Sequence, residues 1–245
     1  MEMIKIDRSF TIDMTASPDR LAFVSAIASQ SHSMKRKVEA EESMANAPAL
    51  SAQLRTGTIS LHREIELVLG LPGAIRCQND YVLWLGRYLG IYEPLEHLLA
   101  EFPDWDALDR ARPPNHTARL LDDLIAIGAD PSALPRVEPA QLPALPTFAF
   151  ALGASYVLEG ATLGGRLILR DLQTRIGAPI ANATRFFGGK SNTIGSGWPS
   201  FKSALDGFGD THPKLQGNVV AGAERTFSAM LAWFAAFRVV GFRRS

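Results

Sequence analysis

Two side chains one helical turn apart have the types and spacing to hold a metal through a single imidazole. His62 and Glu66 stand four residues apart in the segment LRTGTISLHREIE, and side chains at that spacing meet on a helix. A carboxylate that accepts a hydrogen bond from one ring nitrogen leaves the lone pair of the other nitrogen for a metal. One histidine is too few for a structural zinc site, but it suffices as the axial ligand of a haem. An ordinary surface pair is the alternative interpretation of the same spacing.

A second unusual segment, LGASYVLEGATLGGRLILRDL, carries four glycines inside a helical apolar pattern. Each interior glycine costs a helix about 1 kcal/mol relative to alanine, so the cluster needs a reason. Gly153, Gly160 and Gly164 are spaced to share one face, and Gly165 adds local flexibility. The missing side chains allow either another helix to approach the backbone or a flat ligand to lie against it, with room above for a small gas molecule.

The segment around His62 is predicted to be a helix from Ser51 to Gly70. Its apolar stripe alternates spacings of four and three residues. The stripe consists of Leu54, Thr58, Leu61, Ile65 and Val68. Gly70 then ends the helix. His62 is therefore expected at the edge of a buried face.

Further helices are predicted over residues 81–99, 117–127, 148–176, 198–205 and from 215 onward. Pro94 inside the first of these predicts a kink or a break. The proline-marked connectors and the Gly- and Asn-rich stretch 177–197 are predicted to be loops. No run alternates apolar and polar residues between turn signals, so we expect a single all-α domain.

The composition of the chain argues against several classes of protein. The 245 residues include 25 basic and 25 acidic side chains, which gives no electrostatic footprint for nucleic acid or an anionic membrane. Cys77 is the only cysteine, so internal disulfides and multi-thiolate metal sites are excluded and a reduced, cytoplasmic protein is expected. No apolar stretch approaches the roughly 20 residues that span a bilayer. Residues 1–43 are expected to be a flexible extension, and residues 44–245 the folded domain.

The two segments resemble the haem oxygenase family, in particular its soluble bacterial members. The resemblance also includes two closing pieces, Trp198–Phe201 (WPSF) and Ala223–Phe227 (AERTF), and extends from about Leu54 to Phe237. Two separated motifs in the right order are more specific than either alone. The resemblance implies a multi-helical bundle in which haem lies between a proximal helix and a kinked, glycine-rich distal helix.

The resemblance also implies roles for individual residues. His62 would be the axial ligand of the haem iron, and Glu66 its hydrogen-bond partner. Gly160, Gly164 and Gly165 would form the distal wall, whose bare backbone leaves room for dioxygen. Haem would be both cofactor and substrate and would yield biliverdin, carbon monoxide and ferrous iron. A reductase or ferredoxin would supply the electrons, and a phytochrome apoprotein is a candidate recipient of the biliverdin.

Three further residues are expected near the haem. Arg55 precedes His62 by two helical turns, about 10 Å along the same face, and suits a cation that reaches a propionate. Lys202 resembles a basic position that family members use for the same purpose. Phe227 would pack near the haem as a wall residue or simply fill the core.

One position departs from the family pattern. Animal members carry an aspartate directly after the first distal glycine, where it organises waters that protonate bound oxygen, and this chain has Ala161 there. A haem-binding carrier or sensor that has lost turnover is therefore an alternative. A helical bundle with another ligand, whose glycines serve helix packing, is a third. The other histidines, His32, His97, His116 and His212, are expected at the surface or in loops.

Overall fold

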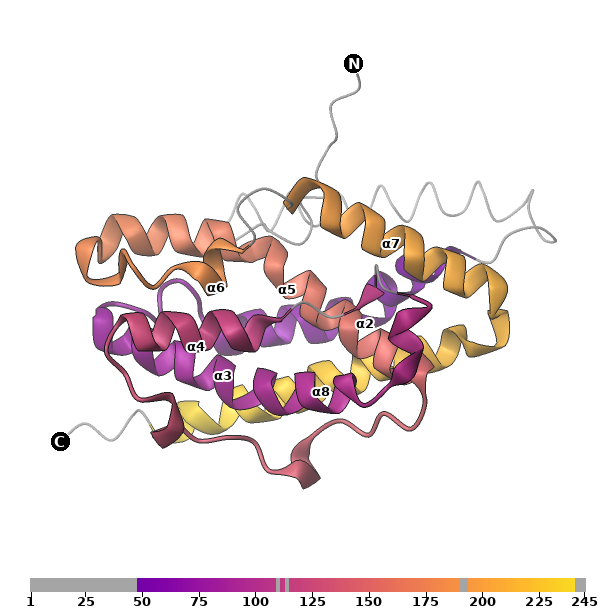
Figure 1. Cartoon of the computed structure of the whole chain (residues 1–245), viewed down its shortest axis with the longest axis horizontal. Helices are drawn as coiled ribbons and strands as arrows, with labels where there is room; N and C mark the ends of the chain where they lie inside the picture. Colours follow the sequence, from indigo (N-terminus) through magenta and orange to yellow (C-terminus); the bar gives the residue numbers. More distant parts are fainter. Residues whose placement is uncertain (1–47, 109–110, 113–114, 190–193, 241–245) are drawn as a thin grey trace, which may run out of the picture. The chain divides into compact units, whose positions relative to one another are not determined.

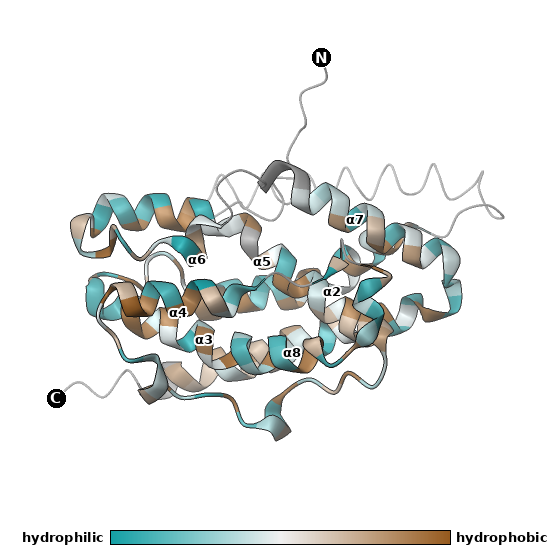
Figure 2. Cartoon of the chain, in the orientation of Figure 1, coloured by the Kyte–Doolittle hydropathy of each residue, from teal (hydrophilic) through white to brown (hydrophobic). Residues whose placement is uncertain are grey.

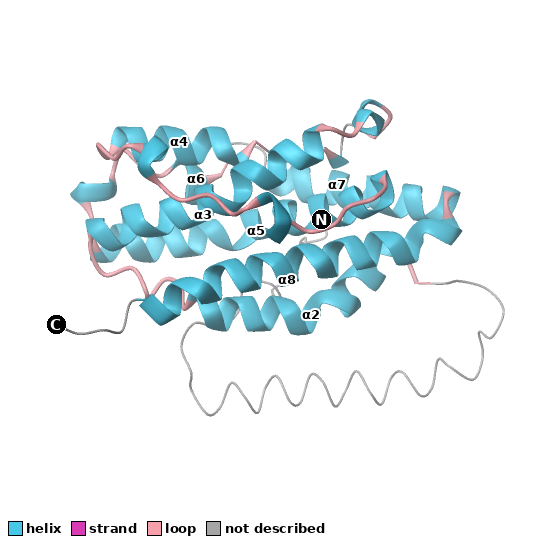
Figure 3. Cartoon of the chain, turned by 90° about the horizontal axis from the view of Figure 1, so that it is seen from below, coloured by secondary structure: helices cyan, strands magenta, loops and turns pink. Residues whose placement is uncertain are grey.

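The computed structural model describes residues 48–240 except 109–110, 113–114 and 190–193. The described part consists of helices joined by loops and contains no strand, which confirms the all-α prediction (Figure 3). The predicted extension, residues 1–43, lies outside the described residues. The helices are α2 (Leu50–Leu69), α3 (Gln78–Ala100), α4 (His116–Ala126), α5 (Phe148–Arg175), α6 (Arg185–Gly188), α7 (Ile194–Thr211) and α8 (Gln216–Val240).

Helix α8 is the element on which the bundle is built. Both α2 and α5 pack extensively on it, whereas α2 and α5 make little contact with one another. Figure 3 shows α2 and α8 side by side. Each helix carries hydrophobic and hydrophilic residues along its length (Figure 2), and the hydrophobic ones form one core cluster.

Two adjacent residues of α8 lie close to glycines of two different neighbouring helices. A Cβ atom on Gly153 of α5 would lie 1.9 Å from the carbonyl oxygen of Val219. A Cβ atom on Gly57 of α2 would lie 2.9 Å from a methyl group of Val220. A side chain at Gly153 would collide with the backbone of α8 and push α5 away, whereas at Gly57 the side chain of Val220 would have to move.

Helix α2 follows the sequence pattern closely. Leu54, Thr58 and Ile65 of the predicted stripe are buried, with Leu61 and Val68 partly buried against the same core. The helix ends where it was predicted to end, because Gly70 adopts a left-handed conformation (φ 60°) and its N–H bonds to the carbonyl of Glu66.

Helix α3 continues through Pro94, so the predicted break does not occur. Proline has no N–H to give to the carbonyl of Gly90, one turn earlier. That carbonyl instead accepts a hydrogen bond of 2.8 Å from the N–H of Val137 in the long connector before α5. The helix survives because a distant segment replaces the lost donor.

Helix α5 bends between its two halves in Figure 1. Gly160, Gly164 and Gly165 lie in the middle of the helix, and closely spaced glycines are a common cause of such bends. The prediction of a loop over 177–197 is wrong in part, because this stretch contains the one-turn helix α6. Helix α7 also extends beyond the predicted range 198–205 in both directions.

No described helix combines the length and the apolar character needed to cross a lipid bilayer.

Candidate functional site

His62 and Glu66 meet on α2 as their spacing predicts. Nδ1 of His62 lies 3.6 Å from a carboxylate oxygen of Glu66, and the two side chains are 17% and 54% exposed. Burial lowers the pKa of His62, so the imidazole is neutral at pH 7 and carries a lone pair. Burial raises the pKa of Glu66. A half-buried neutral imidazole with a carboxylate close by has the chemistry of a possible metal ligand.

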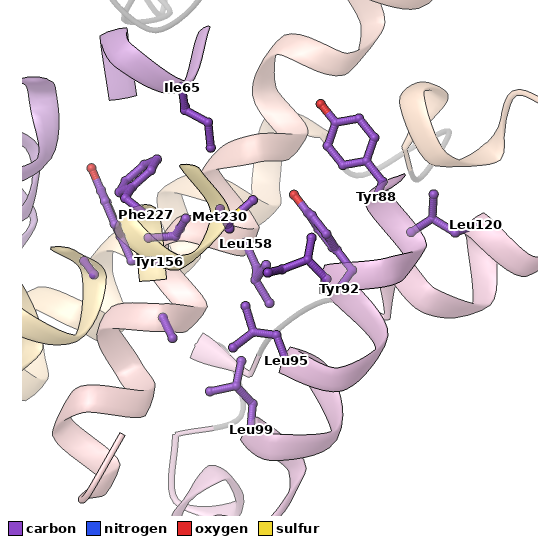
Figure 4. Packing of buried hydrophobic residues seen from close by; sticks show 14 of the residues in the cluster. Ile65, Tyr88, Tyr92, Leu95, Leu99, Leu120, Tyr156, Leu158, Phe227 and Met230 are labelled. Carbon is purple, nitrogen blue, oxygen red and sulfur yellow. The ribbon is translucent and has the colours of Figure 1, made fainter. Parts of the chain in front are cut away.

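Phe227 of α8 packs against the ring of His62. The two ring centroids are 5.9 Å apart in an edge-to-face arrangement, and Phe227 is buried. The contact joins α2 to α8 and restricts the imidazole. Ile65, Tyr156 and Phe227 enter this part of the core from three different helices (Figure 4).

The three predicted distal glycines have different surroundings. A Cβ atom on Gly164 would meet no described atom within 4 Å, and one on Gly160 would meet only the ring of Trp198, at 3.9 Å. A Cβ atom on Gly165 would lie 2.6 Å from the carbonyl oxygen of Phe187, just past the middle of α6. Gly160 and Gly164 therefore leave the backbone of α5 open, whereas Gly165 allows a close approach to the next segment.

An aromatic group beside Gly160 was not assigned a role from the sequence. The ring of Trp198 stacks on Phe201 at 5.6 Å and lies 5.6 Å from Tyr156 of α5. Trp198 and Phe201 belong to the closing motif WPSF, and that motif was the signal that could have found them. These rings form an apolar wall next to the open backbone.

Arg55 and Lys202 are both exposed, on α2 and α7. The two helices run in opposite directions in Figure 1. Ser51 joins them, because its N–H and hydroxyl donate hydrogen bonds of 2.8 and 3.0 Å to the carboxylate of Asp206. Arg55 stands four residues after Ser51, and Lys202 four residues before Asp206. Both cations therefore lie one turn from the same contact, on the side toward His62.

His116 is not a surface residue, so that prediction is wrong. Its side chain is 2% exposed, and its Nε2 lies 3.2 Å from the carbonyl oxygen of Leu158 on α5. The carboxylate of Glu96 on α3 accepts the backbone N–H of His116 at 2.7 Å. The first residue of α4 is thus held between α3 and α5. His97 and His212 are exposed as expected, and His32 lies outside the described residues.

Comparison with known proteins identifies one family. The family model described as heme oxygenase matches residues 48–236. No curated protein and no solved structure was found to match the chain.

Proposed function

The chain belongs to the haem oxygenase family, and from that membership we propose that it cleaves haem oxidatively. The products would be biliverdin, carbon monoxide and ferrous iron, with dioxygen as co-substrate and electrons from an external donor. The observation that carries this proposal is the open backbone of α5 at Gly160 and Gly164. Helix α5 and the His62 helix, α2, both pack on α8 but make little contact with each other.

The residues present fit a haem. His62 offers a neutral, half-buried imidazole. The faces of a porphyrin are flat and apolar, which suits the glycine backbone beside Trp198 on one helix and Phe227 beside His62 on another. Arg55 and Lys202, each one helical turn from the Ser51–Asp206 contact, are the cations that would pair with the propionates. Bound haem would supply the iron that activates dioxygen and the ring that is cleaved.

Each residue then has a definite task. His62 would hold the iron through Nε2, and Glu66, whose carboxylate lies 3.6 Å from Nδ1, would accept the hydrogen of Nδ1 and so fix that tautomer. Phe227 holds the imidazole ring in place. Gly160 and Gly164, where added Cβ atoms would meet little or nothing, would leave room for dioxygen above the haem. Gly165 contributes indirectly, because it lets the segment around Phe187 support α5 from another side.

One titration tests the proposal. Hemin is added to the full chain and a Soret band is followed to its stoichiometric end point; a reductant is then added in air. We expect a one-to-one haem complex whose spectrum converts to that of a bile pigment. Absence of a stoichiometric Soret band would contradict haem binding altogether.

A second candidate function is a haem carrier or sensor without turnover. Ala161 favours it, because a methyl group cannot organise the waters that an aspartate would hold at this position. A haem complex that stays unchanged under reductant and air would support the carrier. Formation of bile pigment would exclude it.

Further parts of the proposal concern the cellular setting. We infer a cytoplasmic protein whose working domain is residues 44–245. A reductase or ferredoxin would deliver electrons, and a phytochrome apoprotein would receive the biliverdin. A chain that starts at Met44 and retains haem turnover at the rate of the full chain would support these domain limits.

A further inference from the structure

The ring of Trp198 limits the space beside one of the two open glycines of α5. A Cβ atom on Gly160 would lie 3.9 Å from Cη2 of Trp198 and would meet no other described atom within 4 Å. Carbon atoms in ordinary contact are about 3.5–4.0 Å apart, so the gap between the helix backbone and this ring is about as deep as one methyl group. At Gly164, one turn later, a Cβ atom would meet no described atom within 4 Å, and the space there is wider.

The same ring belongs to a group of aromatic side chains that extends to His62. Its centroid lies 5.6 Å from that of Tyr156 on α5. Tyr156 stands four residues before Gly160 and therefore on the same face of the helix. Tyr156 and Phe227 enter the same part of the core (Figure 4), and the ring of Phe227 lies 5.9 Å from that of His62. Trp198 is thus connected through these rings to the imidazole as well as to the open backbone.

Two anchors hold Trp198 in place. Its ring stacks on the buried ring of Phe201, with the planes 10° apart and the centroids separated by 5.6 Å. Further along α7, the carboxylate of Asp206 accepts hydrogen bonds of 2.8 and 3.0 Å from Ser51 of α2. Because the ring is stacked on a buried neighbour and its helix is tied to α2, Trp198 forms a fixed wall of the space beside Gly160.

We propose that Trp198 is a specificity-determining residue, which restricts the molecules that can bind haem iron on the side of α5 to small ones such as dioxygen. This inference rests on the proposed function. A diatomic molecule has a cross-section close to that of a methyl group, and the gap at Gly160 accepts a methyl group. An aromatic base such as imidazole is wider in the plane of its ring and would collide with the indole.

The ferric haem complex provides a test that does not depend on turnover. Cyanide and imidazole are the probes, and the binding of each is followed as a shift of the Soret band. We expect Trp198→Ala to lower the Kd of imidazole by about tenfold or more and to change the Kd of cyanide by less than about threefold, because only the larger probe gains from the lost ring. An equal change for both probes, or no change for imidazole, overturns the inference.

A second variant keeps the test decisive if Trp198→Ala does not fold. Trp198→Phe retains a ring that can stack on Phe201 but is smaller than indole. We expect it to lower the Kd of imidazole less than Trp198→Ala does, again with little change for cyanide. An imidazole Kd in Trp198→Phe that equals the native value overturns the inference.

Gly160→Ala tests whether the glycine and the indole border the same space. Its methyl group fits at 3.9 Å from Trp198, so the fold should be retained while imidazole binds more weakly. In the double variant Gly160→Ala/Trp198→Ala this weakening should be smaller, because the methyl group and the probe share the room left by the indole. Strictly additive effects of the two substitutions would show that they border different spaces and would overturn the inference.

Trp233→Ala is the matched control. Trp233 is also a partly exposed tryptophan, but it lies on α8, where its ring meets Phe237 at 4.8 Å and its indole N–H donates to the carbonyl of Arg87. We expect this variant to leave the ratio of the two Kd values unchanged. A change as large as that in Trp198→Ala would indicate a general loosening of the bundle and would overturn the inference.

The measurements distinguish the two possible failures. A chain that binds no haem overturns the proposed function and with it this inference. A chain that binds and degrades haem, but whose Trp198 variants keep the native ratio of imidazole to cyanide Kd, leaves the proposed function standing and overturns this inference alone.

Discussion

The carboxylate of Asp123 accepts the backbone N–H of Phe186 at 2.8 Å. Its other oxygen accepts the N–H of Arg185 at 2.9 Å, so a fully buried side chain of α4 holds the first turn of α6. Phe187, the next residue, presents its carbonyl oxygen to Gly165 of α5. One carboxylate therefore fixes the segment that supports the middle of the glycine-rich helix.

The first prediction concerns that carboxylate. Asp123→Ala leaves two partly buried N–H groups without an acceptor and should cost about 3 kcal/mol of unfolding free energy. The neighbouring Asp122 is 61% exposed and only 3.7 Å from Arg185, so Asp122→Ala should cost less than about 1 kcal/mol. Urea denaturation of the two variants measures the difference. Equal losses would show that the cap is not a significant source of stability.

The second prediction separates two adjacent glycines. Gly165→Ala places a methyl group against the carbonyl of Phe187 and should destabilise the fold by about 1–3 kcal/mol. Gly164→Ala meets no described atom, so it should leave the fold intact or stabilise it by up to about 1 kcal/mol. Under the proposed function, Gly164→Ala should instead weaken haem binding or slow turnover. A Gly164→Ala variant with native haem affinity and rate would exclude a distal role for this glycine.

The third prediction concerns the iron ligand. His62→Ala should bind haem with an altered Soret band, and added imidazole should restore the native spectrum, because it replaces the missing ring. His97→Ala is the matched control, since His97 is exposed on α3. Native iron coordination in His62→Ala would show that another residue is the ligand.

The fourth prediction concerns the two cations. Arg55→Ala and Lys202→Ala should each weaken haem binding by a few-fold, with little effect on the melting temperature, because both side chains are exposed. Added salt should reduce the difference from the native chain. Arg170→Ala, also exposed but on α5, serves as control. Equal effects of all three variants would indicate a general charge effect with no propionate contact.

The fifth prediction is a pH dependence. The pKa of His116 falls to about 3 in the folded chain from 6.5, mainly through burial. A depressed histidine pKa adds stability that is complete above pH 6.5 and is lost as the pH falls toward 3, because the unfolded chain takes up the proton first. Denaturation curves between pH 7 and pH 4 should show this loss, and His116→Gln should show less of it. An equal loss in both proteins would place the acid sensitivity elsewhere.

The structure could be predicted from the sequence wherever a local pattern of residues determines it. The stripe of α2, its end at Gly70 and the meeting of His62 with Glu66 all follow from helical spacing. It was insufficient where distant segments decide. Nothing local to Pro94 shows that Val137 will bond to the carbonyl of Gly90. His116 stands beside two prolines in a polar stretch, and only the packing of α4 between α3 and α5 buries it.

The glycines illustrate the same limit. Their spacing indicates a shared face for Gly153, Gly160 and Gly164, but one face of a long helix can have several neighbours along its length. Gly153 packs against α8, whereas a Cβ atom on Gly164 would meet no described atom within 4 Å. The role of each glycine depends on what lies opposite, and that is a property of the tertiary structure.

Through Val219 and Val220, helix α8 keeps α2 and α5 apart. These consecutive residues lie against Gly153 of α5 and Gly57 of α2. The spacing between α2, which carries His62, and the glycine-rich α5 therefore depends on the same turn of α8. An added methyl group at Gly153 would push α5 away from α8 and so widen the spacing between the two outer helices.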